Sequence, residues 1–145
     1  MTYFNILLAG LFIVAAFVFG ISSRVSPPPD PPACAVSGIV DGDTVDLVCD
    51  GVEFRARLTG FDTPETYEPA CPAEAALGRQ ATARLRQMVT GATRIEADIG
   101  GTDRYGRRLV ALSLDGQAVA RRMIAENLAV PYSGGRRIDW CDRLS

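Results

Sequence analysis

Hydrophobic residues follow two different patterns along this chain of 145 residues. Residues 3–23 carry no charged side chain and are mostly apolar, and the run is near the minimum length for a membrane span. Residues 24–33 hold five of the nine prolines, which is typical of a stiff spacer. We therefore predict an N-terminal apolar helix within 1–23 that is a membrane anchor or a signal peptide, a Pro-rich linker at 24–33, and a folded domain at 34–145.

Within the domain the apolar positions alternate over short segments. Val52, Phe54, Ala56 and Leu58 fall on one face of such a segment, as in a barrel strand that faces a filled interior. Asp41-Gly42 is a strong signal for a two-residue hairpin turn. The pattern predicts strands at 35–40, 45–49, 52–59, 94–98 and 109–114.

Two segments have apolar residues at helical spacing instead. The first runs from Pro72 to about Val89, and the second spans 118–127. Five short strands interrupted by one helix and followed by another favour an α+β fold. Specifically, they fit a five-stranded OB-type Greek-key β-barrel with two helices packed on it.

The four cysteines bear on both the fold and the compartment. The chain has no histidine, and no two cysteines are close enough in sequence for a typical zinc site. If Asp41-Gly42 is a hairpin turn, Cys34 and Cys49 are equally far from it, which leaves Cys71 to pair with Cys141. Four free thiols are the alternative. Two disulfides favour a location outside the cytoplasm, and this outweighs Arg24, whose charge weakly favours the opposite orientation.

The basic residues are all arginine, fifteen in number, with no lysine and no histidine. Mechanisms that need an imidazole or a lysine amine are therefore excluded. Any catalysis must use carboxylates, arginines, hydroxyls or a metal. The formal net charge of −2 predicts weak non-specific affinity for nucleic acid, with positive potential confined to the site.

Three short clusters contain the groups that phosphodiester cleavage needs. They are Asp41-Gly42-Asp43-Thr44, the run from Arg57 to Glu65, and the run from Asp103 to Arg107. Carboxylates can hold a metal and take a proton from water, and guanidiniums can bind the oxygens that gain charge in the transition state. We interpret Asp41 as a turn residue that accepts a hydrogen bond from its own backbone.

The residues and spacing of these clusters resemble the staphylococcal nuclease (thermonuclease) family, over residues 35–132. The resemblance implies Asp43 and Asp62 as carboxylate ligands of Ca²⁺ and the carbonyl of Thr63 as a third ligand. It also implies Glu65 as the general base. An ordinary glutamate is a poor base at neutral pH, so the metal must supply part of the activation of water.

The same resemblance implies that Arg57 and Arg107 hold the phosphate through their planar guanidiniums. We assign solvent-exposed or ion-paired roles to the other arginines near them, such as Arg55 and Arg108. Tyr105 and Tyr132 are candidates for substrate binding. Either tyrosine is equally compatible with a packing role at the edge of the barrel.

Together these features predict an exported Ca²⁺-dependent nuclease that hydrolyses single- or double-stranded DNA, RNA or both. We expect a monomer on the periplasmic or extracellular face, anchored by its N-terminal segment or secreted after cleavage. The alternative is a non-catalytic OB-fold module that binds nucleic acid or protein. Degenerate family members lose the carboxylates or arginines, whereas this sequence keeps all the matched positions, which favours the enzyme.

Overall fold

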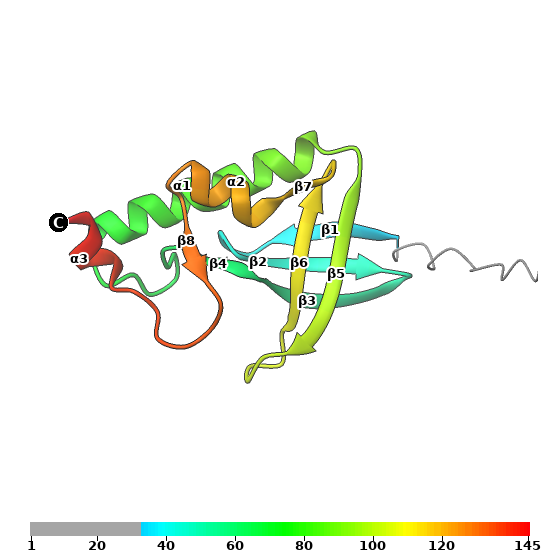
Figure 1. Cartoon of the computed structure of the whole chain (residues 1–145), viewed down its shortest axis with the longest axis horizontal. Coiled ribbons are helices and arrows are strands. Elements are labelled where there is room, and N and C mark those ends of the chain that lie inside the picture. Colours follow the sequence, from blue (N-terminus) through cyan, green and yellow to red (C-terminus); the bar gives the residue numbers. More distant parts are fainter. Residues whose placement is uncertain (1–32) are drawn as a thin grey trace, which may run out of the picture.

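The computed structural model describes residues 33–145 as a mixed α+β domain (Figure 1). The strands are β1 (Cys34–Ile39), β2 (Thr44–Cys49), β3 (Val52–Leu58), β4 (Gly60–Asp62), β5 (Ile95–Thr102), β6 (Arg108–Leu114), β7 (Gln117–Ala118) and β8 (Val130–Tyr132). The helices are α1 (Pro72–Gly91), α2 (Val119–Ala125) and α3 (Trp140–Leu144). Within this part of the chain, no helix is both long and apolar enough to cross a membrane. The predicted apolar helix and nearly all of the predicted linker lie outside the described residues.

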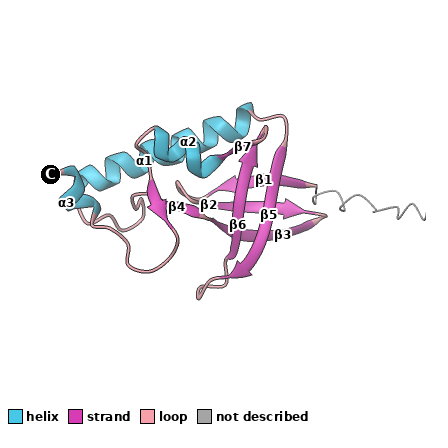
Figure 2. Cartoon of the chain, viewed as in Figure 1, coloured by secondary structure: helices cyan, strands magenta, loops and turns pink. Residues whose placement is uncertain are grey.

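The main sheet has the order β1-β2-β3-β6-β5, and the short strand β7 pairs with β6. Neighbours are antiparallel except for β3 and β6, which are parallel. In Figure 2, β5 and β6 cross the direction of β1–β3 steeply, so the sheet is strongly twisted. Across the described strands β1 and β5 share no hydrogen-bonded ladder, so the sheet is not closed into a barrel. The predicted strand segments are confirmed, but the predicted closed barrel is wrong at this edge.

The strands β4 and β8 form a separate two-stranded sheet that the hydrophobic pattern did not predict. Each is only three residues long, too short to show an alternation. Their pairing places Gly60 opposite Tyr132 and Asp62 opposite Val130. This small sheet therefore links the second sequence cluster to the C-terminal part of the chain.

The helix α1 lies along one side of the sheet, with α2 beside it and α3 near the C-terminus (Figure 1). Proline in the first turn is compatible with the start of α1, because its missing N–H would have no intrahelical partner. Within α1, Ala81, Leu85 and Met88 are buried, whereas Leu77 and Val89 are only partly buried. The domain has three helices, because five residues at the C-terminus form the additional helix α3.

The buried core lies between the main sheet and the helices. Its side chains come from alternating positions of the central strands and from one stripe of α1. They include Val45, Leu47, Ala56, Leu58, Val110, Leu112, Leu114, Ala81, Leu85 and Met88.

The structure contains both predicted disulfides, Cys34–Cys49 and Cys71–Cys141. The turn is longer than predicted, because the amide of Val40 donates to the carbonyl of Thr44 and closes a wider loop. A bulge between Val36 and Gly38 then shifts the register by one residue. The longer turn and the bulge offset each other, and Cys34 still lies opposite Cys49.

Candidate active site

An open cleft of about 1050 Å³ is lined by residues of the three sequence clusters, by Tyr132 of β8 and by the loop that follows it. Five predicted site residues line it: Arg57, Glu65, Tyr105, Arg107 and Tyr132. Other lining residues include Asp41, Arg55, Asp103, Arg104, Leu109, Gly134, Gly135 and Arg137. The cleft therefore contains both predicted phosphate-binding arginines and the predicted base.

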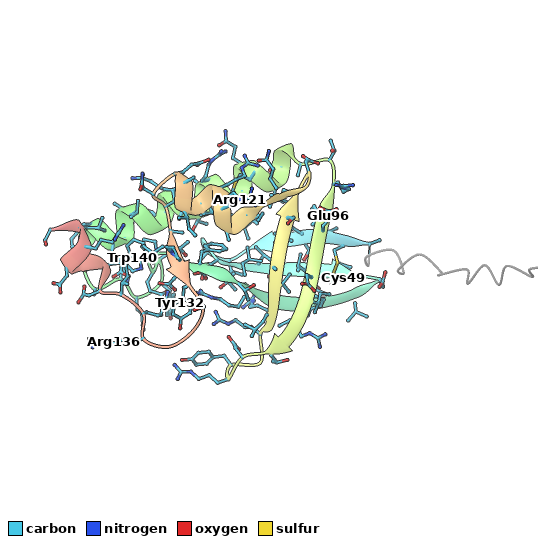
Figure 3. All side chains as sticks on the ribbon, viewed as in Figure 1. Cys49, Glu96, Arg121, Tyr132, Arg136 and Trp140 are labelled. Atoms are coloured by element: carbon cyan, nitrogen blue, oxygen red, sulfur yellow. A yellow bond between two sulfur atoms is a disulfide. The ribbon has the colours of Figure 1, made fainter. Side chains whose placement is uncertain are left out.

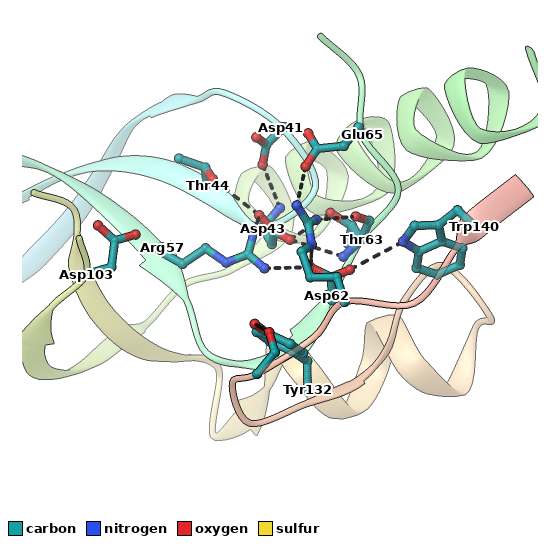
Figure 4. A network of polar contacts seen from close by, with 12 residues as sticks. Asp41, Asp43, Thr44, Arg57, Asp62, Thr63, Glu65, Asp103, Tyr132 and Trp140 are labelled. Atoms are coloured by element: carbon teal, nitrogen blue, oxygen red, sulfur yellow. Dashed lines mark hydrogen bonds and ion pairs between the residues drawn. The ribbon is translucent and has the colours of Figure 1, made fainter. Parts of the chain in front are cut away.

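Asp43 and Asp62 lie side by side, 1% and 0% exposed. One guanidinium joins them: Nη1 of Arg57 donates to Oδ1 of Asp43, and Nη2 donates to Oδ1 of Asp62 at 2.8 Å. Figure 4 shows the two carboxylates on either side of the Arg57 head group. Carboxylates this well buried need a cationic partner, and here Arg57 supplies one.

Strand register brings Asp43, Arg57 and Asp62 together. Asp43 directly precedes β2, whose Thr44 lies opposite Arg57 of β3. The amide of Leu58 donates to the carbonyl of Asp43 at 2.7 Å. Asp62 ends β4, only five residues after Arg57. The sheet therefore fixes the spacing of the first two clusters before any ligand binds.

Thr63 is held directly against Asp43. Its amide and its hydroxyl both donate to Oδ2 of Asp43, at 3.1 and 3.0 Å. A Cβ added at Gly42 would lie 2.8–2.9 Å from the Thr63 side chain, so only glycine permits this approach. The oxygens predicted to bind the metal, on Asp43, Asp62 and Thr63, are thus gathered in one place.

The turn that carries Asp43 is stabilised by Asp41. Oδ1 of Asp41 accepts a hydrogen bond from the amide of Asp43 at 2.9 Å. This is the turn role predicted for Asp41, and it directs the Asp43 side chain toward Asp62.

The loop that carries Glu65 is held by α1. Glu74 is a buried carboxylate in the first turn of α1, and it accepts hydrogen bonds from the amides of Glu65 at 3.2 Å and Ala70 at 2.7 Å. A Cβ at Gly78 would lie 2.8–2.9 Å from the carbonyl oxygens of Pro64 and Glu65. Sequence reasoning missed both positioning residues, although Glu74 and Gly78 lie at helical spacing in line with the buried residues Ala81, Leu85 and Met88.

Arg107 is positioned by Asp103. Oδ2 of Asp103 accepts from Nε of Arg107 at 2.7 Å, and Oδ1 accepts from the amides of Tyr105 and Arg107. Nη1 of Arg107 reaches the hydroxyl of Thr44 at 3.3 Å, next to Asp43. The guanidinium of Arg107 thus reaches the residue beside Asp43, while its carboxylate partner fixes its orientation.

The two candidate tyrosines differ in exposure and partners. Tyr105 is 68% exposed, and the guanidiniums of Arg104 and Arg107 lie 4.7 and 5.5 Å from the centre of its ring. Tyr132 is at the end of β8, and its hydroxyl donates to the carbonyl of Gly135 at 2.8 Å. Both line the cleft, and Tyr132 additionally holds the loop that follows it.

Two contacts to Asp62 come from the C-terminal region and were not predicted. Trp140 donates from Nε1 to Oδ2 of Asp62 at 3.3 Å, as drawn in Figure 4. Nε of Arg137 lies 2.7 Å from Oδ1 of the same carboxylate. Arg137 also donates to Oε1 of Glu65 and, at 3.2 Å, to the carbonyl of Thr63. Nothing in the spacing of the C-terminal residues indicated these contacts, because they depend on the β4–β8 pairing.

The pKa values reflect the concentration of charge in this site. Burial raises the pKa of Asp43 to about 7, against the opposing effect of Arg57, and the nearby carboxylates of Asp41 and Asp62 raise it further. Burial also acts on Asp103, but hydrogen bonds from Arg107 and Tyr105 outweigh it and lower the pKa of that carboxyl. Burial lowers the pKa of Arg137, but its contacts to Asp62 and Glu65 outweigh that effect and raise it.

The donor set fits a hard divalent cation. Two carboxylates and a peptide carbonyl are the oxygen ligands that such ions prefer. All three already accept hydrogen bonds from guanidiniums, on Asp43 and Asp62 from Arg57 and on Thr63 from Arg137. Each of these oxygens therefore already faces a positively charged group, as it would face a bound cation.

Comparison with known proteins identifies the family of the chain. The family model described as staphylococcal nuclease homologue matches residues 55–139, more than half of the chain. The chain belongs to the staphylococcal nuclease family. The matched segment of this family member contains Arg57, Asp62, Glu65 and Arg107, whereas Asp43 and Trp140 lie outside it and enter the site through the fold.

The chain is also similar in sequence to proteins named thermonuclease or endonuclease. The chain is 35% identical over 95 residues to the thermonuclease of Staphylococcus intermedius, covering 65% of this chain and 56% of that protein. It is 34% identical over 92 residues to the thermonuclease of Staphylococcus hyicus, with coverage of 63% and 54%. It is 34% identical over 92 residues to endonuclease YncB of Bacillus subtilis (strain 168), with coverage of 62% and 43%. The chain thus spans about half the length of these relatives.

Proposed function

We propose that this protein is a metal-dependent nuclease that hydrolyses phosphodiester bonds in the cleft described above. The observation that carries the proposal is the assembly of two buried carboxylates, the Thr63 carbonyl, Glu65 and two arginines at one site. The matched relatives named thermonuclease and endonuclease support the same reaction class.

Each group in the site has a distinct task. Asp43, Asp62 and the carbonyl of Thr63 would hold a divalent cation, for which we propose Ca²⁺ because all three ligands are oxygens. When bound, the ion would polarise the phosphate and acidify water. Glu65 would then accept the proton of the attacking water, because its carboxylate is partly exposed and lines the cleft.

The two arginines would hold the substrate. A phosphate in the cleft offers oxygens to the guanidiniums of Arg57 and Arg107, which bind it in a bidentate manner and stabilise the charge that develops in the transition state. Exposed Tyr105 would contact a base or sugar beside the phosphate. Because this recognition uses the backbone, we propose that DNA and RNA are both substrates.

We further propose that the protein acts as a monomer outside the cytoplasm. The two disulfides support an oxidising compartment. Attachment to the membrane through residues 3–23, or release after cleavage, stays a proposal based on the sequence.

One experiment tests the function directly. The purified, oxidised full chain is incubated with labelled single-stranded DNA in CaCl₂ or in chelator, next to Asp62→Asn as the control, and products are separated on a denaturing gel. We expect cleavage by the parent protein in Ca²⁺ only. If the protein binds DNA but does not cleave it in any divalent ion, the proposed nuclease function is wrong and the non-catalytic binding module is the better description.

A further inference from the structure

The guanidinium of Arg137 occupies the oxygens that the proposed function assigns to the metal and to the base. It contacts Oδ1 of Asp62 at 2.7 Å and the carbonyl oxygen of Thr63 at 3.2 Å, and it is ion-paired with the carboxylate of Glu65. A divalent cation on Asp62 and Thr63 would bind the same oxygen atoms. The side chain and the ion therefore compete for these ligand atoms.

The charges of the site also disfavour simultaneous occupancy. The carboxylates of Asp43, Asp62 and Glu65 face the guanidiniums of Arg57 and Arg137. With all three carboxylates ionised and both arginines in place, one negative charge remains uncompensated, and a divalent ion would leave a net positive charge. If one arginine withdraws as the ion enters, the cluster becomes neutral, which is the favourable state in a poorly solvated site.

The surroundings of the two arginines decide which one withdraws. The Arg57 side chain is 12% exposed and belongs to β3, where strand pairing fixes its backbone. The Arg137 side chain is 39% exposed and lies in the loop between β8 and α3. Gly134 and Gly135 of that loop have φ of 109° and 89°, so they adopt conformations open mainly to glycine. Arg137 lines the open cleft and belongs to no strand, so its withdrawal would leave the strand pairing intact.

We propose that Arg137 is a built-in competitor for the divalent cation: it neutralises the Asp62–Thr63–Glu65 oxygens before metal binds and must leave them for the site to load. This inference rests on the proposed function, because it presumes that the site binds a metal. Release of Arg137 also frees the carboxylate of Glu65 from its ion pair. The freed guanidinium remains in the cleft, where a substrate phosphate provides it with a new partner. Arg137 is thus a positioning residue that links metal loading to the state of Glu65.

The chain contains its own reporter for a test of this competition. Trp140 is the single tryptophan, and its indole N–H donates to Asp62, so its fluorescence should change when Asp62 binds an ion. The oxidised full chain is titrated with CaCl₂ while Trp140 fluorescence is recorded, and calorimetry gives an independent Kd. Arg137→Gln removes the competitor. Arg136→Gln is the matched control, because it removes the same charge from the neighbouring exposed position in the loop, which Figure 3 labels.

We expect Arg137→Gln to bind Ca²⁺ more tightly, with a Kd lower by roughly three- to tenfold, since a partly exposed ion pair no longer has to break. Arg136→Gln should have the parent Kd within about twofold. In chelator, Arg137→Gln should unfold at a lower temperature than the parent, and Ca²⁺ should raise its Tm by more. If Arg137→Gln does not fold, Arg137→Lys replaces it. Lysine lacks the planar fork that spans the three oxygens, so it should also bind Ca²⁺ more tightly than the parent, by a smaller factor.

Three results would overturn the proposal: an unchanged Kd for Ca²⁺ in Arg137→Gln, a higher Kd in that variant, or an equal gain in Ca²⁺ affinity in Arg136→Gln. A higher Kd would mean that Arg137 only holds the loop in place. The proposed function fails separately. If neither the parent nor Arg137→Gln binds a divalent ion, both proposals fall. If Arg137→Gln binds Ca²⁺ more tightly but no form of the protein cuts DNA, the competition stands and the nuclease assignment falls.

Discussion

The two walls of the cleft are held in place by different kinds of interaction. The sheet wall consists of Asp43, Arg57 and Asp62, which lie almost completely out of solvent. Pairing of β2 with β3 fixes Asp43 and Arg57, and Asp62 ends β4, where it lies opposite Val130 of β8. The C-terminal wall, formed by Tyr132, Arg137 and Trp140, follows a two-stranded ribbon and is attached to α1 through the Cys71–Cys141 disulfide. The sheet wall is thus part of the core, whereas the C-terminal wall depends on a covalent bond outside the sheet.

The difference indicates a division of labour between the walls. Under the proposed function, the sheet wall would supply the carboxylates that hold the cation. Admitting a polymer and exchanging one cation for another requires a part that moves, and the proposed withdrawal of Arg137 would provide it. Glu65 lies between the walls: its amide is fixed by Glu74 of α1, and its carboxylate is held by Arg137.

Glu65→Gln should give the largest effect on activity, because it removes the proton acceptor while keeping the shape of the side chain. We expect kcat to fall by about 10²- to 10⁴-fold, with Ca²⁺ affinity and DNA binding retained. Single-turnover cleavage measures the loss of catalytic rate, and filter binding in chelator measures the affinity for DNA. Glu68→Gln, an exposed change in the same loop, should cut at the parent rate. Near-parent activity in Glu65→Gln would require a different base.

Removal of the Cys71–Cys141 bond should destabilise the fold and release the C-terminal wall of the cleft. The bond closes a separation of 70 residues, against 15 for Cys34–Cys49, and should stabilise the fold by roughly 3–5 kcal/mol in the loop-closure model. We expect Cys71→Ser with Cys141→Ser to lower the free energy of unfolding by that order, measured by urea denaturation. The variant should also shift Trp140 fluorescence toward that of exposed indole.

The matched control for that change is Cys34→Ser with Cys49→Ser. It should be destabilising by a smaller amount, because its loop is shorter, and it should leave the fluorescence of the folded state unchanged. Equal fluorescence changes in both double variants would mean that the C-terminal wall does not depend on its own disulfide.

Arg57→Lys tests the sheet wall. Lysine keeps the charge but cannot bridge Asp43 and Asp62 through two nitrogens in one plane. We expect cleavage to slow by roughly a hundredfold, as also expected for Arg107→Lys. Arg55→Lys is the control two residues away: its side chain borders the cleft, but it is 55% exposed and pairs with Asp46 instead of Asp43 or Asp62. A similar loss in Arg55→Lys would mean that general charge, not the geometry of Arg57, controls the rate.

The sequence predicted the sheet wall better than the C-terminal wall, for a physical reason. Alternating apolar and polar residues along 52–58 and the Asp and Gly turns identify strands locally, and antiparallel pairing then places Asp43 beside Arg57. Strand β8 is three residues long, and the contacts of Arg137 and Trp140 span 72 and 78 residues. No local pattern in the sequence can predict contacts between residues so far apart along the chain. Glu74 is buried because the loop that carries Glu65 lies over the start of α1, and this contact is not encoded in the local pattern of the helix.

The smallest of these effects should come from Gly78→Ala, which acts on the support beneath Glu65. The new methyl group would meet the carbonyls of Pro64 and Glu65 at 2.8–2.9 Å, so the loop must lift from α1. Overpacking of this kind costs about 1–3 kcal/mol, partly offset by the better helix propensity of alanine. We expect a modest fall in the free energy of unfolding, measured by urea denaturation, and a several-fold drop in kcat. Gly91→Ala, with no atom within 4 Å of the new methyl group, should leave kcat unchanged. If Gly78→Ala were as stable and as active as the parent, the Glu65 loop would tolerate displacement, and the rigidity ascribed to its α1 support would have to be abandoned.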